Sequence, residues 1–256
     1  MQLGNMISEI EAADGIVKLK VKDSPDAKAE EVVVKIPALG AYSKTWPLKC
    51  DKSEQIVRNL ADFLRTRDYS NISHTHGPAM LFMLSTGEEK DLDVVRGWVD
   101  KMAEKYKGAE EITVHNWSLG YSGIALCEYY LRTGDRSILP VISKLADCAR
   151  WGMYNNGWAH GTYQGVRDRG KARMAFPYMG GGHINTCGEH VVTFLLMARE
   201  CGAEVDEQTL QASFRHFFRY AARGNVAYGD QLSERSFVDN GKTGGLAFTM
   251  EAATNL

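Results

Sequence analysis

Three segments of this chain repeat one order of parts, and that repetition constrains the fold more than any other feature. Each segment begins with a polar, glycine-containing loop, continues as a helix that is apolar on nearly every face, and is followed by an amphipathic helix. The apolar helices are predicted within residues 74–87, 115–134 and 176–202, and their amphipathic partners at 92–106, 137–149 and 207–222. The closing glycines are Gly87, Gly134 and Gly202. Another helix is predicted at 53–65, with Ser53 as its cap, and a fourth repeat begins at 240–253.

The third apolar helix indicates how these parts pack. Residues 191–198 are apolar on nearly every side, so protein should surround this helix on nearly every face. The amphipathic helices carry one apolar stripe each and should cover the apolar helices from outside. Repeated helix pairs form closed or stacked arrays. We therefore predict a mainly α protein, a partial α/α toroid that is incomplete at its C-terminus, with an open solenoid as the alternative.

The first part of the chain has a different pattern. Its predicted elements are a short helix at 6–13, strands at 16–21 and 31–36, and a turn at 23–26. Two strands and one helix form too small a core to be stable alone. We therefore interpret residues 1–38 as the C-terminal remnant of a β-rich domain, residues 39–52 as a linker, and residues 53–256 as the helical domain.

Composition excludes several classes of function. A net charge of −2 gives no electrostatic reason to expect binding to nucleic acid. No apolar run reaches the roughly 18 residues of a membrane span, and no basic-then-apolar signal segment is present. The five cysteines lack the spacing of a disulfide framework or a zinc ribbon. Cys127 and Cys148 lie in apolar helical patterns and are expected to be buried.

A set of short motifs resembles a bacterial family of unknown function. The motifs are residues 32–37, 40–44, 46–50, 117–120, 129–135, 157–161, 180–185, 200–202, 228–230 and 240–242. The resemblance implies a PDZ-like segment before an α/α toroid, over essentially the whole chain, and it implies no activity. At the level of fold, such toroids are similar to terpenoid cyclases, protein prenyltransferases and glycan-processing enzymes, but a shared fold does not carry a function.

Histidines are concentrated at the starts of the predicted inner helices. Because inner helices of a toroid run parallel, their N-termini should share one rim, where anionic ligands are favoured. The histidines expected to meet there are His74, His76, His115, His160, His183 and His190, while His216 lies on an outer helix. The aromatic residues beside them are Trp117, Tyr121, Trp158, Tyr163 and Tyr178. The alternative is that these histidines only cap helices and hold loops.

Three further groups are candidates for chemistry. The long loop at 154–181 carries basic residues that suit an anionic group, namely Arg167, Arg169, Lys171 and Arg173. The carboxylates considered for acid–base catalysis are Glu128, Glu189, Asp168 and Asp230, and burial in its helix is expected to raise the pKa of Glu128. His183, Cys187 and His190 share one helical face and are zinc-ligand types, although no known zinc signature has their spacing.

Three functional hypotheses follow from these residues. The first is an enzyme acting on a glycan or similar polar substrate at the mouth of the toroid, with His183, His190, Glu189 and His160 as catalytic residues. Its ligand-binding residues are Trp117, Tyr121, Trp158, Tyr163, Tyr178, Asn185 and Arg167. The second is a non-catalytic binding or scaffold module for a polymer or peptide. The third is a zinc-dependent enzyme that uses His183, Cys187 and His190.

Overall fold

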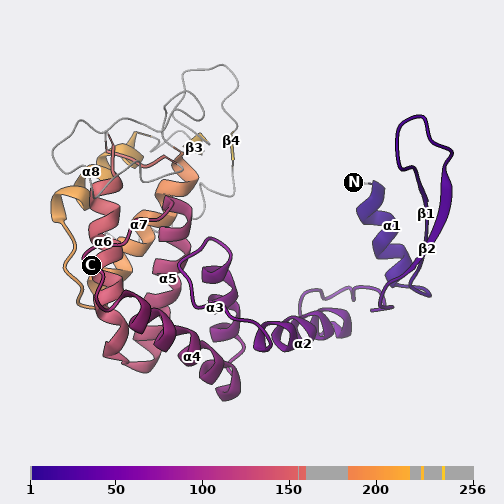
Figure 1. Cartoon of the computed structure of the whole chain (residues 1–256), viewed down its shortest axis with the longest axis horizontal. Helices are drawn as coiled ribbons and strands as arrows, with labels where there is room; N and C mark the ends of the chain where they lie inside the picture. Colours follow the sequence, from indigo (N-terminus) through magenta and orange to yellow (C-terminus); the bar gives the residue numbers. More distant parts are fainter. Residues whose placement is uncertain (1, 155, 160–183, 220–225, 228–237, 240–256) are drawn as a thin grey trace. The chain divides into compact units, whose positions relative to one another are not determined.

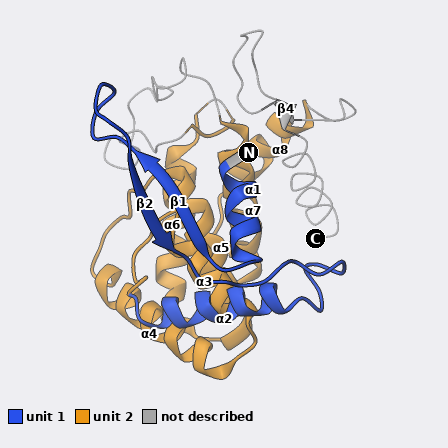
Figure 2. Ribbon diagram, turned by 90° about the vertical axis from the view of Figure 1, so that its right-hand side faces the viewer, with its two compact units in different colours: residues 1–67 blue, residues 68–256 orange. Residues whose placement is uncertain are grey.

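The computed structural model describes residues 2–154, 156–159, 184–219, 226–227 and 238–239, and this part of the chain is mainly helical (Figure 1). The chain divides into two compact units, Met1–Arg67 and Asp68–Leu256 (Figure 2). The domain boundaries at 38/39 and 52/53 stay predictions from the sequence. The fourth apolar helix, predicted at 240–253, lies outside the described residues.

The first unit contains a hairpin and two helices. Its elements are α1 (Gln2–Glu11), β1 (Ile16–Val21), β2 (Glu30–Lys35) and α2 (Asp51–Arg65). The two strands pair antiparallel, with Val17 opposite Val34 and Lys20 opposite Glu31. The strands agree with the predicted ranges to within one residue. The helix α1 begins four residues earlier than predicted, and α2 begins before Ser53 because acidic residues suit a helix N-terminus and Asp51 opens the first turn.

The first unit has a small core. Its buried apolar residues are Val17, Cys50, Ala61 and Leu64. Large apolar side chains remain exposed in the hairpin, the connecting segment and α2, and these include Val33, Trp46, Leu48 and Phe63. A buried ion pair ties α2 to the end of α1, with Lys52 Nζ 2.6 Å from Glu11 Oε2. This small core agrees with the prediction that so few elements bury little apolar surface.

The second unit is built from helix pairs. Its elements are α3 (His76–Ser85), α4 (Glu89–Tyr106), α5 (Asn116–Thr133), the 3₁₀ turn η1 (Arg136–Ile138), α6 (Leu139–Gly152), α7 (Asn185–Glu200), α8 (Glu207–Phe218), β3 (Val226–Ala227) and β4 (Val238–Asp239). The amphipathic helices α4, α6 and α8 agree with their predicted ranges to within four residues at each end, and α3, α5 and α7 lie inside the segments predicted for the apolar helices. None of the helices in the described ranges is both long and apolar enough to cross a membrane.

The helices form an inner and an outer set, as predicted. The inner helix α5 packs against α3 on one side and α7 on the other, while α4, α6 and α8 pack against the inner helices (Figure 1). No residue of α7 is exposed before Glu200, which confirms that this helix is enclosed on nearly every face. The predicted closing glycines Gly87, Gly134 and Gly202 all adopt left-handed backbone angles, with φ between 70° and 81°.

The inner helices run parallel. At the N-terminal ends of α3 and α5, a Cβ atom on Gly77 would lie 2.5 Å from the carbonyl group of Tyr121. At the C-terminal ends of the same helices, the Arg132 guanidinium donates to the carbonyl of Leu84. The N-terminal end of α3 therefore contacts the N-terminal end of α5, and the C-terminal ends of the two helices also contact each other. The helices α3 and α5 are therefore parallel.

The same argument orients α5 and α7. A Cβ on Gly120 would lie 2.7 Å from Cβ of His190, and one on Gly123 would lie 2.3 Å from the ring of Phe194. Further along both helices, the Cys201 thiol donates to the carbonyl of Cys127 at 3.8 Å. The three inner helices therefore have their N-termini at the same end, which the sequence analysis predicted.

Candidate functional site

A pocket of about 390 Å³ lies at the N-terminal ends of the inner helices, lined by His74, His115, Trp117 and Tyr121. His74 precedes α3, and His115 is the N-cap residue of α5. Trp117 and Tyr121 are on the first two turns of α5. Histidines from two different repeats therefore meet beside aromatic rings, as the parallel arrangement predicts.

The aromatic wall of the pocket comes from one face of α5. Trp117 and Tyr121 are four residues apart, a spacing that brings side chains together on a helix. Their ring centroids are 6.2 Å apart and their planes differ by 19°. From α7, the ring of His190 packs edge-on against Tyr121 at 4.3 Å and lies 6.0 Å from Trp117. Three repeats thus contribute to this site.

A pair of serines holds the loop that carries His74. The backbone N–H of Ser73 donates to Ser122 Oγ at 3.0 Å. In return, the Ser122 hydroxyl donates to the backbone carbonyl of Ser73, also at 3.0 Å. The close approach at Gly77 lets α3 start directly against α5. The position of His74 is therefore set by hydrogen bonds to α5.

Buried asparagines begin both α5 and α7. Asn116 Nδ2 donates to the carbonyl of Ala159 at 2.8 Å. Asn185 Oδ1 accepts from His216 Nε2 at 2.8 Å, and Arg219 lies 2.9 Å from Nδ1 of the same ring. Asn185 is only 2% exposed, so this side chain joins α7 to α8. The ligand contact expected at Asn185 stays a prediction, and the contact that the structure shows is this hydrogen bond to α8.

The electrostatics of the wall favour neutral side chains. Burial is the main cause that raises the pKa of Tyr121, and the negative charge of Glu189 adds to it. Burial also raises the pKa of the Cys187 thiol well above its usual range. The Nδ1–H of His190 donates to the Thr186 carbonyl at 2.8 Å, because a carbonyl oxygen can only accept.

Two other predicted residues have different surroundings from those expected. Trp158 is fully buried, and its indole N–H donates to the carbonyl of Ala149 at 2.9 Å, so this ring fills the core. Glu128 is exposed, so the prediction that its helix buries it is wrong. It shares an exposed stripe of α5 with Leu131 and Arg132, because no described element covers that face.

The remaining histidine and loop predictions divide into two groups. His76 contacts the ring of Tyr69 at 4.8 Å and accepts from the backbone N–H of Asn71, away from the pocket lining. The other residues lie outside the described part of the chain, namely His160, Tyr163, Arg167, Asp168, Arg169, Lys171, Arg173, Tyr178, His183 and Asp230. Among the residues that are described, no three His, Cys, Asp or Glu side chains could hold a metal ion.

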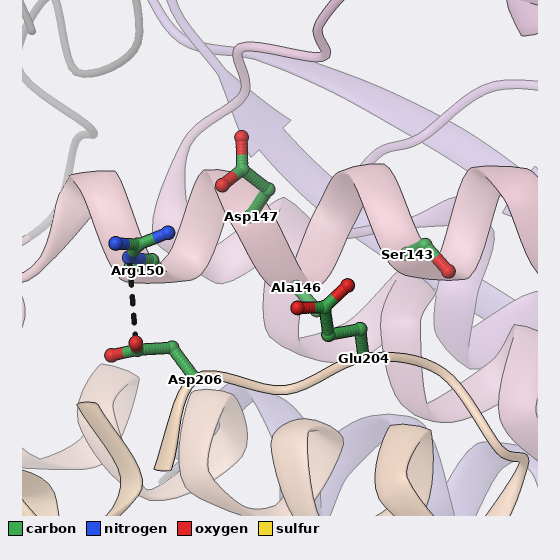
Figure 3. Close-up of a pocket in the computed structure, with 6 residues that line it drawn as sticks. All are labelled: Ser143, Ala146, Asp147, Arg150, Glu204 and Asp206. Atoms are coloured by element: carbon green, nitrogen blue, oxygen red, sulfur yellow. Dashed lines mark ion pairs between the residues drawn. The ribbon is translucent and has the colours of Figure 1, made fainter. Parts of the chain in front are cut away.

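A second pocket, of about 280 Å³, lies between α6 and the segment before α8 (Figure 3). Its lining residues are Ser143, Ala146, Asp147, Arg150, Glu204 and Asp206. Asp206 caps α8 by accepting from the Thr209 backbone at 2.8 Å and from the Thr209 hydroxyl at 2.6 Å, and this hydroxyl is the main cause that lowers the pKa of Asp206. Arg150 Nε is 3.6 Å from Asp206 Oδ1. These groups stabilise the start of α8.

Sequence reasoning missed the residues that support the first pocket. The Ser73–Ser122 contact joins residues 49 apart, and nothing local to either serine indicates it. A usable signal exists for the asparagines, because Asn116 and Asn185 occupy the same position in two repeats. A buried polar residue repeated at one place in a helix pair indicates a structural hydrogen bond.

Comparison with known proteins gives one family. The model of a domain of unknown function, DUF6288, matches residues 53–255. No curated protein matches the chain, and no solved structure matches it. The matched range contains α2 from its third residue onward and all the described helices of the second unit, including every residue of the pocket lining. The chain belongs to the DUF6288 family.

Proposed function

We propose that this protein binds a sugar, or a polar ring ligand of similar shape, in the pocket lined by His74, His115, Trp117 and Tyr121. The single observation that supports it most is the stacked Trp117–Tyr121 wall beside two imidazoles. A sugar ring has an apolar face that packs on aromatic rings and a rim of hydroxyl groups that needs hydrogen bonds. The volume of about 390 Å³ is within the range of small-molecule sites.

Tryptophan fluorescence and calorimetry with a panel of oligosaccharides would test this proposal. We expect Trp117→Ala to abolish binding and Trp117→Phe to retain part of it, because phenylalanine keeps a stacking face. Trp151→Phe is a matched control, since Trp151 bonds Asp147 on α6 and does not line this pocket. Equal binding by wild type and Trp117→Ala would refute the proposal.

Catalysis on the bound ligand is a second candidate function, favoured by His190. Its Nδ1 is held by the Thr186 carbonyl, so the ring is oriented as a general base requires. Glu189 is adjacent to His190, and its charge acts on Tyr121. Under this hypothesis, His190→Gln removes turnover while binding largely survives. Under the binding or scaffold hypothesis no variant changes a turnover rate, and His183→Ala weakens binding instead.

The zinc hypothesis stays a prediction for His183, Cys187 and His190. Its support is the shared helical face. Burial raises the pKa of the Cys187 thiol, so zinc binding there would have to displace its proton, because a thiolate is the zinc ligand. Metal analysis of the purified protein would decide: near-stoichiometric zinc that is lost in Cys187→Ala would support a metal site, and metal-free protein would reject it.

We also propose that the helix pairs form part of an α/α toroid and that the first unit is PDZ-like. Support for the toroid comes from the parallel inner helices and the outer helices packed on them. Support for the PDZ-like origin is limited to the hairpin and the motifs of the first fifty residues. An experimental structure in which the inner helices form an open array would refute the toroid.

A further inference from the structure

We infer that the ligand of this pocket is an acidic sugar, one that carries a carboxylate, rather than a neutral sugar. This inference rests on the proposed function and names the ligand class of the same pocket. It depends on the charges at the N-terminal end of the inner helices and on the polar groups that line the pocket.

The first observation is the lack of carboxylates at the start of the inner helices. The N-cap residues Thr75, His115 and Ile184 of α3, α5 and α7 make no side-chain cap hydrogen bond, and none of these helices has an acidic residue in its first turn. The outer helix α8 has both, in Asp206 and Glu207. Helix N-termini carry partial positive charge. Three parallel helices therefore direct their positive ends to the end of the layer where the pocket lies, with no acidic residue in their own first turns.

The second observation is the kind of polar group in the lining. His74 and His115 are imidazoles, which donate hydrogen bonds and become cationic when protonated. The described lining contains no carboxylate. The Tyr121 hydroxyl has a raised pKa and stays neutral at physiological pH. Each of these groups can donate to a carboxylate, and none of them repels it.

The third observation is a buried hydroxyl in the first turn of α7. Thr186 is 7% exposed, and its hydroxyl has no hydrogen-bond partner in the described structure. Buried hydroxyl groups normally have a partner, so a missing one indicates a bound water or ligand. The carbonyl of the same residue holds His190 against Tyr121. This hydroxyl therefore belongs to the first turn of α7, one turn before His190, whose ring packs against the wall.

Glu189 is the acidic residue that opposes this inference and also makes it testable. It lies in the second turn of α7, and its charge raises the pKa of Tyr121. If the ligand is anionic, the negative charge of Glu189 repels it. Glu189→Gln should therefore strengthen binding of an acidic sugar and leave a neutral sugar unaffected.

The experiment is calorimetry of the full chain with trigalacturonate and, as its neutral counterpart, galactotriose. We expect wild type to bind trigalacturonate at least about tenfold more tightly, the effect of one hydrogen bond to a charged group. His74→Gln/His115→Gln should remove this preference while circular dichroism stays unchanged. His76→Gln is the matched control, since His76 contacts Tyr69 and not the pocket, and it should keep the preference.

The outcomes separate the inference from the proposed function. Equal affinity of wild type for both sugars, or a preference for the neutral one, would overturn the inference and leave sugar binding intact. A preference that the double variant retains would also overturn it. Binding of neither sugar by wild type would count against both the inference and the proposed function.

Discussion

The close packing of α5 on α7 can be tested by adding a single methyl group at Gly123. A Cβ atom there would lie 2.3 Å from Cδ2 of Phe194, well inside van der Waals contact. Phe194 is fully buried, so its ring has no space into which it can move. Gly97, in the middle of α4, is the matched control because nothing lies within 4 Å of the Cβ position there.

The magnitude follows from two opposing effects. Replacing glycine by alanine inside a helix stabilises it by about 1 kcal/mol. Overpacking a buried contact costs about 1–3 kcal/mol. Gly97→Ala should therefore raise the free energy of unfolding by about 1 kcal/mol. Gly123→Ala carries both effects, so it should be less stable than Gly97→Ala by about 1–3 kcal/mol.

Urea denaturation followed by far-ultraviolet circular dichroism measures this difference. Both variants must keep the wild-type dependence on urea concentration, since a changed slope would indicate a different denatured or native state. If Gly123→Ala proves as stable as Gly97→Ala, α5 and α7 do not approach as described, and the parallel inner layer loses its main support.

Three further perturbations test other contacts. Lys52→Met removes the buried partner of Glu11 and should destabilise the first unit by up to about 3 kcal/mol, seen as faster amide hydrogen exchange. Asp206→Ala should cost about 1 kcal/mol at pH 7. Because the Thr209 hydroxyl lowers the folded-state pKa of Asp206, this stabilisation is complete above the unfolded pKa of about 3.9 and is lost as pH falls through the folded value. Denaturation at several pH values would show that the difference in free energy of unfolding between Asp206→Ala and wild type becomes smaller in acid. A difference that does not change with pH would contradict this role of Asp206. Ser122→Ala should cost about 1 kcal/mol and weaken ligand binding, because it frees the loop before α3.

Local patterns in the sequence were sufficient for the helices and their layers. A helix that is apolar on all sides has to be enclosed, and α7 is enclosed up to Glu200. Glycine tolerates a left-handed backbone better than other residues, which is why Gly87, Gly134 and Gly202 marked the helix ends correctly. Parallel inner helices then followed from the repeat, and with them the meeting of His74 and His115.

The surroundings of individual side chains were harder to predict. Trp158 and Trp117 both lie near loops with aromatic and glycine residues, yet Trp158 fills the core and Trp117 lines a pocket. Glu128 sits in an apolar segment of α5 and is still exposed. In each case the exposure of the side chain depends on whether another helix or loop covers it. The residue type alone does not give this information.

The sequence by itself therefore determined the mainly helical class and the helix pairs, because periodicity and glycine positions are local properties. The tertiary structure decided which side chains form the pocket. The Ser73–Ser122 hydrogen bonds join residues 49 apart, and the contact between Gly120 and His190 depends on two helix backbones approaching closely. Such non-local contacts arise only when whole helices pack, so no single stretch of sequence specifies them.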